Sequence, residues 1–212
     1  MEFARLFEDN FDFAFNAATY NNMKVAIRAY EQFVKENEDF FSFDKGKSLF
    51  GRLRAYAVER QFYQSAFKPR AGYSVIVKPV NNYGYNALCI ETEDFIVNIG
   101  HTDSAERLLT ASAYKKEFAK ANAGLGMQLS FDFTDAGAGI VEGKKYVEIT
   151  YGYHSGEITH LNIVVPSGDY KGIEYSINLL ENIQIYERYV PEQLVEEEVV
   201  SLKAALTKKA GN

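Results

Sequence analysis

The spacing of apolar residues changes between Ala71 and Gly72, and no other feature of this chain constrains its fold as strongly. Before that point, apolar residues recur every three to four positions, which is the period of one helix face. After it they alternate with polar residues, which is the period of a strand with one buried side. The pattern therefore predicts an α+β fold, in which an N-terminal helical section packs on a mainly antiparallel sheet.

The helical section is expected to span residues 1–70. Within positions 2–18, phenylalanines recur every four residues, as on a helix face, although Phe11, Phe13 and Phe15 also alternate as in a strand. Several alanines in this segment favour the helix. After a second helix, a longer one is predicted at 47–67, because its apolar residues keep the helical period until Pro69 interrupts it. The segment 38–44 between these helices is predicted to be a loop whose aromatic rings tuck under them.

The sheet is expected to occupy residues 71–190 and to contain six or seven strands with one inserted helix. Strands are predicted at about 85–92 and 95–100, on the basis of alternating apolar residues bounded by turn-forming ones. The clearest hairpin in the chain has Ser155 and Gly156 at its turn.

Two helices are predicted after the first strands. Asp103 and Glu106 have the spacing of a capping box, so a helix is expected at 103–123. A closing helix is expected at 191–209, because Pro191 suits the first helical position, with glutamates following early and lysines late. The C-terminal part of the chain should therefore return to helix after the sheet.

Length and composition indicate a single α+β domain over residues 1–212. A chain of this length buries about 70% of its unfolded surface, so it needs no disulfide or metal to fold. The only cysteine, Cys89, cannot form an internal disulfide, and the N-terminus lacks a basic region followed by an apolar run. No apolar stretch reaches the roughly 18 residues of a membrane span. We therefore expect a soluble cytoplasmic protein with no membrane partner.

Charge is unevenly distributed in a chain whose net charge is −6. Residues 44–70 hold seven basic and two acidic side chains, a surplus of five positive charges, whereas both ends of the chain are acidic. A spacing of seven residues from Lys47 to Lys68 places side chains along one exposed stripe of the predicted helix. The stripe consists of Lys47, Arg54, Gln61 and Lys68.

The basic stripe has three interpretations. It could bind the phosphates of a nucleic acid, with Tyr83 in the following turn stacking on a base. It could bind an acidic protein partner. It could also be a solvated helix face, neutralised by the acidic ends of the chain. The candidate binding residues are Lys47, Arg52, Arg54, Lys68, Arg70 and Tyr83.

A nuclease-like pattern follows further along. Asp135 and the Glu142-Gly143-Lys144 segment could hold a divalent metal if they lay on adjoining strands, because Mg²⁺ prefers oxygen ligands and the lysine could position the attacking water. The alternative is a solvated turn, which the glycines between the acids favour. Asp135, Glu142 and Lys144 are thus the only catalytic candidates, and the alternative function that they imply is a metal-dependent nuclease.

Histidines near the predicted hairpin raise the question of zinc. His154 and Glu157 flank its turn, and His160 lies three residues further along. Successive residues of a strand point to opposite faces, so His160 and Glu157 cannot converge on one tetrahedral ion without distortion. We expect no metal and no cofactor.

Polar residues alternate along several predicted strands, including one at 127–133. Antiparallel sheets commonly leave one face in water, so these residues are expected to line a solvated face, which could form a ligand groove. They are Asn98, Gln128, Ser130, Asp132, Glu148, Thr150, His160 and Asn162.

The sequence favours a protein without enzymatic activity but does not decide whether the protein is an enzyme. The first hypothesis is a non-catalytic binding protein that acts through protein–protein contacts, such as a small bacterial or phage inhibitor or accessory factor. Abundant aromatic residues without a catalytic constellation favour this hypothesis over the nucleic-acid binder and the nuclease. The partner and the oligomeric state are left undetermined.

Overall fold

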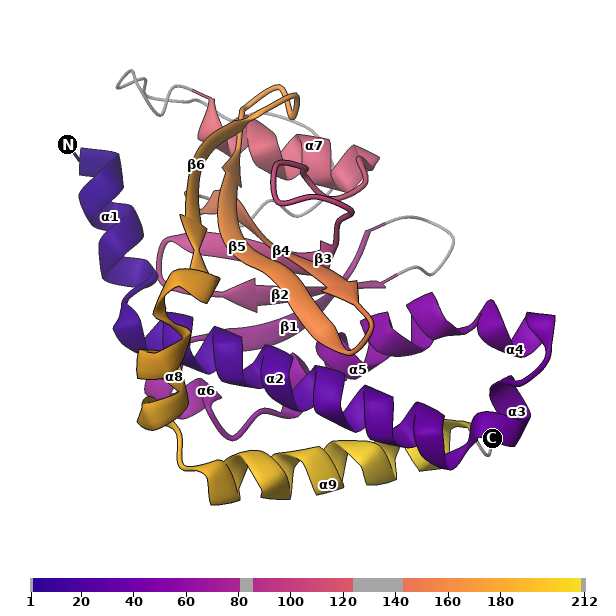
Figure 1. Cartoon of the computed structure of the whole chain (residues 1–212). Coiled ribbons are helices and arrows are strands. Elements are labelled where there is room, and N and C mark those ends of the chain that lie inside the picture. The colour runs from indigo at the N-terminus through magenta and orange to yellow at the C-terminus, as the bar shows by residue number, and fades with distance from the viewer. Residues whose placement is uncertain (1, 81–85, 124–142, 211–212) are drawn as a thin grey trace. The chain divides into compact units, whose positions relative to one another are not determined.

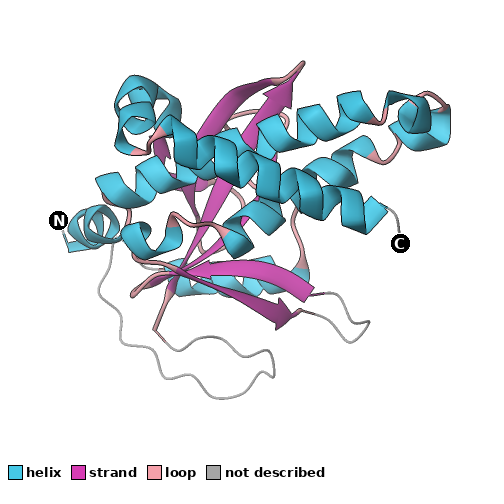
Figure 2. Ribbon diagram, turned by 90° about the horizontal axis from the view of Figure 1, so that it is seen from below, coloured by secondary structure: helices cyan, strands magenta, loops and turns pink. Residues whose placement is uncertain are grey.

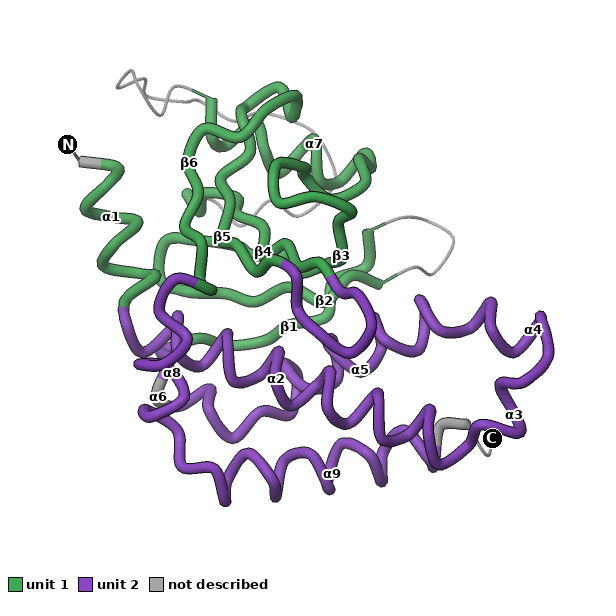
Figure 3. The backbone as a smooth tube through the Cα atoms, in the orientation of Figure 1, with its two compact units in different colours: residues 1–12, 73–152, 160–180 green, residues 13–72, 153–159, 181–212 purple. Residues whose placement is uncertain are grey.

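The computed structural model describes residues 2–80, 86–123 and 143–210, and these form the predicted α+β fold (Figure 1). The chain divides into two compact units, each assembled from three separate segments (Figure 3). We call them the sheet unit and the helical unit. The single domain over residues 1–212 stays a prediction. The sheet unit consists of residues 1–12, 73–152 and 160–180, and the helical unit of residues 13–72, 153–159 and 181–212.

The described residues form a six-stranded sheet whose strands follow one another in sequence order. Only the pairing of the third and fourth strands is parallel among the registers resolved, so the sheet is mainly antiparallel, as predicted. The fourth and fifth strands are joined by a sharp turn at Ser155 and Gly156, whose φ angles of 49° and 89° suit a two-residue hairpin. The strands are β1 (Ser74–Pro79), β2 (Asn86–Glu91), β3 (Phe95–His101), β4 (Lys145–His154), β5 (Glu157–Pro166) and β6 (Ile173–Asn178).

One face of the sheet packs against α1 (Glu2–Asn10). The Phe95 ring of β3 lies 5.8 Å from that of Phe7 and 4.9 Å from that of Phe11. Asn10 fixes the end of α1, because its side chain donates to Asp94 and accepts from Thr92. The expected single helix at 2–18 is therefore wrong: α1 ends at Asn10 and belongs to the sheet unit.

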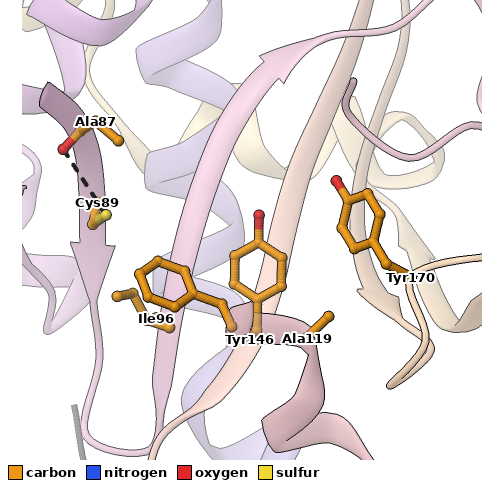
Figure 4. Packing of buried hydrophobic residues seen from close by; sticks show 7 residues of the cluster. Ala87, Cys89, Ile96, Ala119, Tyr146 and Tyr170 are labelled. Atoms are coloured by element: carbon orange, nitrogen blue, oxygen red, sulfur yellow. Dashed lines mark hydrogen bonds between the residues drawn. The ribbon is translucent and has the colours of Figure 1, made fainter. Parts of the chain in front are cut away.

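The other face of the sheet is covered partly by α7 (Ala113–Ala119) and a short 3₁₀ helix, η1 (Lys120–Asn122). Phe118 and Ala119 pack with Ile96 and Tyr146 in a buried cluster (Figure 4). The predicted helix at 103–123 is wrong in its first half, because residues 103–112 form an irregular segment. Asp103 pairs with Arg107 at 3.7 Å instead of capping a helix.

Three long helices form the core of the helical unit: α2 (Phe13–Glu36), α5 (Phe50–Gln64) and α9 (Glu192–Ala210) (Figures 1 and 2). Their inward side chains include Phe33 and Leu206, which are fully or almost fully buried. Cations of α2 also pair with acids of α9, for example Arg28 with Glu192 at 2.8 Å. The final helix confirms the prediction at 191–209, within one residue at either end. The shorter helices are α3 (Glu38–Phe41), α4 (Asp44–Lys47), α6 (Lys68–Ala71), η2 (Leu179–Asn182) and α8 (Ile183–Tyr189). All of these except η2, which spans the division between the units in the sequence, belong to the helical unit.

The long helix predicted at 47–67 is interrupted at both ends. α4 ends at Lys47, and α5 covers only Phe50–Gln64. Pro69 does not stop a helix but lies in the first turn of α6. A main-chain N–H at that position has no partner within the helix, so the N–H that proline lacks costs no helical hydrogen bond. α6 then ends at Gly72, which adopts a left-handed φ of 66°.

Two further predictions lie outside the described residues, the turn at 81–84 and the strand at 127–133. Within the described ranges, no helix combines the length and the apolar character that a membrane crossing requires.

Candidate functional site

The predicted basic residues lie on three separate helices of the helical unit. Lys47 is on α4, where its ammonium lies 3.6 Å from the carboxylate of Asp44. Arg52 is exposed near the start of α5. Arg54, two residues further, is half-buried, and its guanidinium lies 4.5 Å above the ring of Tyr153. Arg54 therefore contacts the protein's own aromatic ring.

The remaining basic residues, Lys68 and Arg70, lie on α6. The Lys68 ammonium donates to the main-chain oxygen of Tyr63 and lies 5.7 Å from that ring's centre. Arg70 lies in α6, but its side chain is outside the part of the chain that the structure describes, and so is all of Tyr83.

Gln61 corrects the prediction of a continuous exposed stripe. Its side chain is fully buried, and its amide nitrogen donates to Asn22 at 3.2 Å and to Glu198 at 2.8 Å. A helical spacing of seven aligns residues on one face but cannot tell which face is covered, and here α2 and α9 cover it. The assignment of Lys47, Arg52, Arg54, Lys68 and Arg70 to binding stays a prediction.

A different surface lies at the connection between α2 and α5. Phe40, Phe43 and Leu49 are 54%, 55% and 39% exposed, which is unusual for three large apolar side chains within ten residues. We call this the tip surface, and it includes the exposed cations that flank them. Its residues are Phe40, Phe43, Lys45, Lys47, Leu49 and Arg52.

The tip surface rests on a tightly folded support. A Cβ atom added at Gly46 would lie 2.8 Å from the main-chain oxygen of Phe40 and 2.9 Å from the Cα of Phe41, so only glycine allows α3 and α4 to approach this closely. Phe41 points inward and is buried, with its ring 6.0 Å from Phe33 and 5.2 Å from Phe50. The exposed rings are thus carried by fixed main chain.

The expectation for residues 38–44 is therefore only partly right, because residues 38–41 form the short helix α3 instead of a loop. Phe41 tucks under the helices, but Phe40 and Phe43 do not. The sequence contained one sign of this outcome: the connection between α2 and α5 is longer than the roughly two to eight residues that usually join neighbouring helices. Long connections of this kind commonly carry function.

The catalytic candidates are not assembled into a metal site by the described residues. Lys144 donates from its ammonium to the main-chain oxygen of Thr92 at 2.7 Å, so it holds the start of β4 near the β2–β3 turn. Asp135 and Glu142 lie outside the described residues. The nuclease hypothesis therefore stays untested.

The hairpin histidines are placed apart from one another. His154 and Glu157 are exposed beside the turn. His160 is buried, and its Nε2 lies 2.8 Å from the hydroxyl of Thr102. Among the residues described, no group of three histidine, cysteine or acidic side chains could hold a metal ion.

The polar face of the sheet is buried, which corrects the prediction of a solvated face. Leu109 and neighbouring residues after β3 lie over it, together with Tyr170. The described polar residues of this face are each 8% exposed or less: Asn98, Glu148, Thr150, His160 and Asn162. The other three, Gln128, Ser130 and Asp132, lie outside the described residues.

Glu148 is the centre of the buried polar face. Its Oε1 accepts from the hydroxyls of Tyr146 at 2.8 Å and Tyr170 at 2.5 Å, and its Oε2 accepts from the Leu109 N–H at 2.9 Å. Figure 4 shows both tyrosine hydroxyls pointing away from Ala119, on the same side of the cluster. Burial of a carboxylate is tolerated when both of its oxygens accept hydrogen bonds in this way.

The groups around Glu148 are held in their neutral forms. Burial, reinforced by the nearby Glu148 charge, raises the pKa of the Tyr146 and Tyr170 phenols. Burial also raises the pKa of the Cys89 thiol, although a hydrogen bond from Asn98 opposes the shift. The two phenols therefore act as hydrogen-bond donors within the core. The Cys89 thiol is a poor nucleophile, because it is buried and protonated.

Comparison with models of protein families, with curated proteins and with solved structures finds no match to this chain.

Proposed function

We propose that this protein is a non-catalytic binding protein that acts through protein–protein contacts, with the tip surface as its contact region. The observation that carries the proposal is the exposure of Phe40, Phe43 and Leu49 on a support that Gly46 keeps tightly folded. Aromatic side chains in a preformed arrangement supply binding area without a large ordering cost.

The charges around the tip surface favour a protein partner over a nucleic acid. The surface carries both signs of charge, because the exposed acids Glu38, Asp39 and Asp44 precede the exposed cations Lys45, Lys47 and Arg52 within fifteen residues. Phosphate backbones require a continuous positive track, whereas protein interfaces have an apolar centre and a polar rim of mixed charge. Such a surface suits a small inhibitor or accessory factor that works by occupying its partner.

The test is affinity capture with matched variants from an extract of the cells in which the protein is made. We expect the wild-type protein to retain a stoichiometric protein partner, and Phe40→Ser combined with Phe43→Ser to lose it. Val200→Ser is the control, because Val200 is 63% exposed on α9 and is not part of the tip surface. Retention of the partner by the double variant, or its absence from wild-type protein, would contradict the proposal.

The same test can also show that the captured partner is a nucleic acid. If nuclease treatment of the extract abolished capture, the partner would be a nucleic acid and the proposal would be wrong. A salt titration would then count the contacts, because log affinity falls with log salt by about 0.9 for each phosphate neutralised.

A further inference from the structure

The irregular segment 102–112, which we call the strap, joins β3 to α7 and lies over the buried polar face. At its start, the Thr102 N–H donates to the Tyr151 oxygen at 2.9 Å. Further along, the Asn162 side chain donates to the main-chain oxygen of Ala105 at 3.1 Å. The strap is therefore bound to the sheet through its main chain at several points.

Leu109 contacts the sheet unit through both of its main-chain polar groups. Its N–H donates to Glu148 at 2.9 Å, and its carbonyl oxygen lies 2.9 Å from the Tyr170 hydroxyl, whose single proton is shared between this oxygen and Glu148. Both main-chain groups of one residue thus contact polar side chains of the sheet unit. Extended peptides are recognised in the same manner, with main-chain groups giving affinity and side-chain pockets giving specificity.

The Leu109 side chain occupies space that is free because Gly100 has no side chain. A Cβ atom added at Gly100 would lie 2.8 Å from the Cδ2 of Leu109, so the leucine sits against bare main chain. Gly100 is paired in register with Thr150 on the same face of the sheet. The sheet thus offers a pocket for one aliphatic side chain beside its two main-chain binding groups.

The strap does not satisfy every group beneath it. The hydroxyl oxygen of Thr150 is buried and has no hydrogen-bond partner among the residues that the structure describes. An unpaired buried hydroxyl costs free energy that a ligand with a suitable hydrogen-bonding group could recover.

We infer that the strap occupies, within its own chain, a binding site for an extended peptide segment of a partner protein. Glu148 and Tyr170 bind the main chain of one residue, and the space above Gly100 accepts its aliphatic side chain. The partner segment replaces the strap when the strap swings away. This site is separate from the tip surface and does not depend on it.

The test uses the full-length protein and a fluorescent peptide identical to residues 104–112. Leu109→Ala weakens the strap and leaves the site intact, so we expect peptide affinity to rise on the order of tenfold, because the competent state is more populated. Adding Glu148→Gln should abolish that gain. Thr110→Ala is the control, because Thr110 is exposed in the strap and should bind like wild type. Equal affinity of Leu109→Ala and wild type, or a gain that survives Glu148→Gln, would overturn the inference.

Amide hydrogen exchange in the wild-type protein keeps the inference testable even if the variants fold poorly. Strap opening should let the Leu109 amide exchange on the order of tenfold faster than the Ile149 amide of β4, because local opening requires less free energy than global unfolding. Exchange of the Leu109 amide only at the rate of global unfolding would show that the strap never opens and would refute the inference. Phe40→Ser with Phe43→Ser should leave peptide binding unchanged, which separates this test from that of the tip surface.

Discussion

In the sheet unit, a buried polar side chain can serve as the hydrogen-bond partner of main-chain groups. Asn122 is the clearest case: its amide nitrogen donates to the oxygens of Tyr146 at 2.8 Å and Pro166 at 2.9 Å. Its side-chain oxygen accepts from the Tyr146 N–H at 2.9 Å. One side chain therefore serves main-chain groups of both β4 and β5, which would otherwise be buried without partners.

Replacement of Asn122 with alanine should lower the free energy of unfolding by about 1–3 kcal/mol, because buried main-chain groups lose their partners. Urea denaturation followed by circular dichroism measures the change. Thr159→Ala on β5 is the control, because Thr159 is exposed and its loss should change stability by less than about 0.5 kcal/mol. Equal effects of the two substitutions would show that the Asn122 hydrogen bonds contribute little.

The burial of His160 predicts that the stability of the protein depends on pH. Burial, together with the charge of His101, lowers the pKa of His160, so the folded protein binds a proton less readily than the unfolded chain does. Stability should therefore fall as pH drops from about 7.5 through the unfolded pKa of about 6.5. Denaturation midpoints at several pH values should show a shallower decline for His160→Gln. His154→Gln, at the exposed hairpin turn, should keep the wild-type slope. An unchanged slope in His160→Gln would assign the decline to other groups.

At the scale of elements, the tip surface depends on how closely two short helices approach one another. α3 and α4 are only four residues long, and isolated helices of that length are unstable in water. They persist here because Phe41 is buried beneath them and Gly46 brings their main chains together.

Gly46→Ala should therefore destabilise the protein by about 1–3 kcal/mol and weaken partner capture, because its Cβ would meet main-chain atoms that cannot move aside. Gly51→Ala is the matched control. A Cβ there meets nothing within 4 Å, and α5 should gain about 0.5–1 kcal/mol from the better helix former. Thermal unfolding of both variants checks the contrast, and a neutral Gly46→Ala would show that the tip can rearrange.

Sequence periodicity predicted those elements whose hydrophobic pattern and main-chain geometry agree. The strands β2 and β3, the turn at Ser155 and Gly156, and the closing helix are of this kind. It failed at residues 103–112, where a capping box gives a local preference for helix but Leu109 is held by Glu148 from a distant strand. Tertiary contacts of that kind override local propensity and leave no trace in local spacing.

The sites were less predictable than the fold, because alternation separates the two faces of a strand without saying what covers them. Glu148 and Thr150 had the pattern of a wet face and are fully buried. Gln61 had the pattern of an exposed stripe and is buried as well. In contrast, the exposed Phe40 and Phe43 were expected inside, because aromatic side chains are usually buried.

At the scale of the whole molecule, the helical unit depends on a helix from the far end of the chain. α9 contributes four apolar side chains to its core, and each is at most 1% exposed. Burying four such side chains is worth about 6–12 kcal/mol, which is comparable to the whole stability of a typical domain. They are Val195, Val199, Leu202 and Leu206.

Deletion of residues 191–212 should therefore unfold the helical unit. We expect the circular dichroism signal at helical wavelengths to fall by more than the share of the deleted residues, because α2 and α5 lose their packing partner. Full-length Val200→Ser should keep the complete signal, since Val200 faces away from the core. A truncated chain with full helicity in α2 and α5 would contradict this account.

The interleaving of the segments also affects how the protein is made. α2 leaves the ribosome before any strand has been synthesised, whereas α9, its packing partner, is translated after all of them. The nascent chain must carry the side of α2 that packs on α9 uncovered throughout elongation. Completion of the helical unit therefore has to be largely post-translational, and chaperones that shield such surfaces should influence its yield in cells.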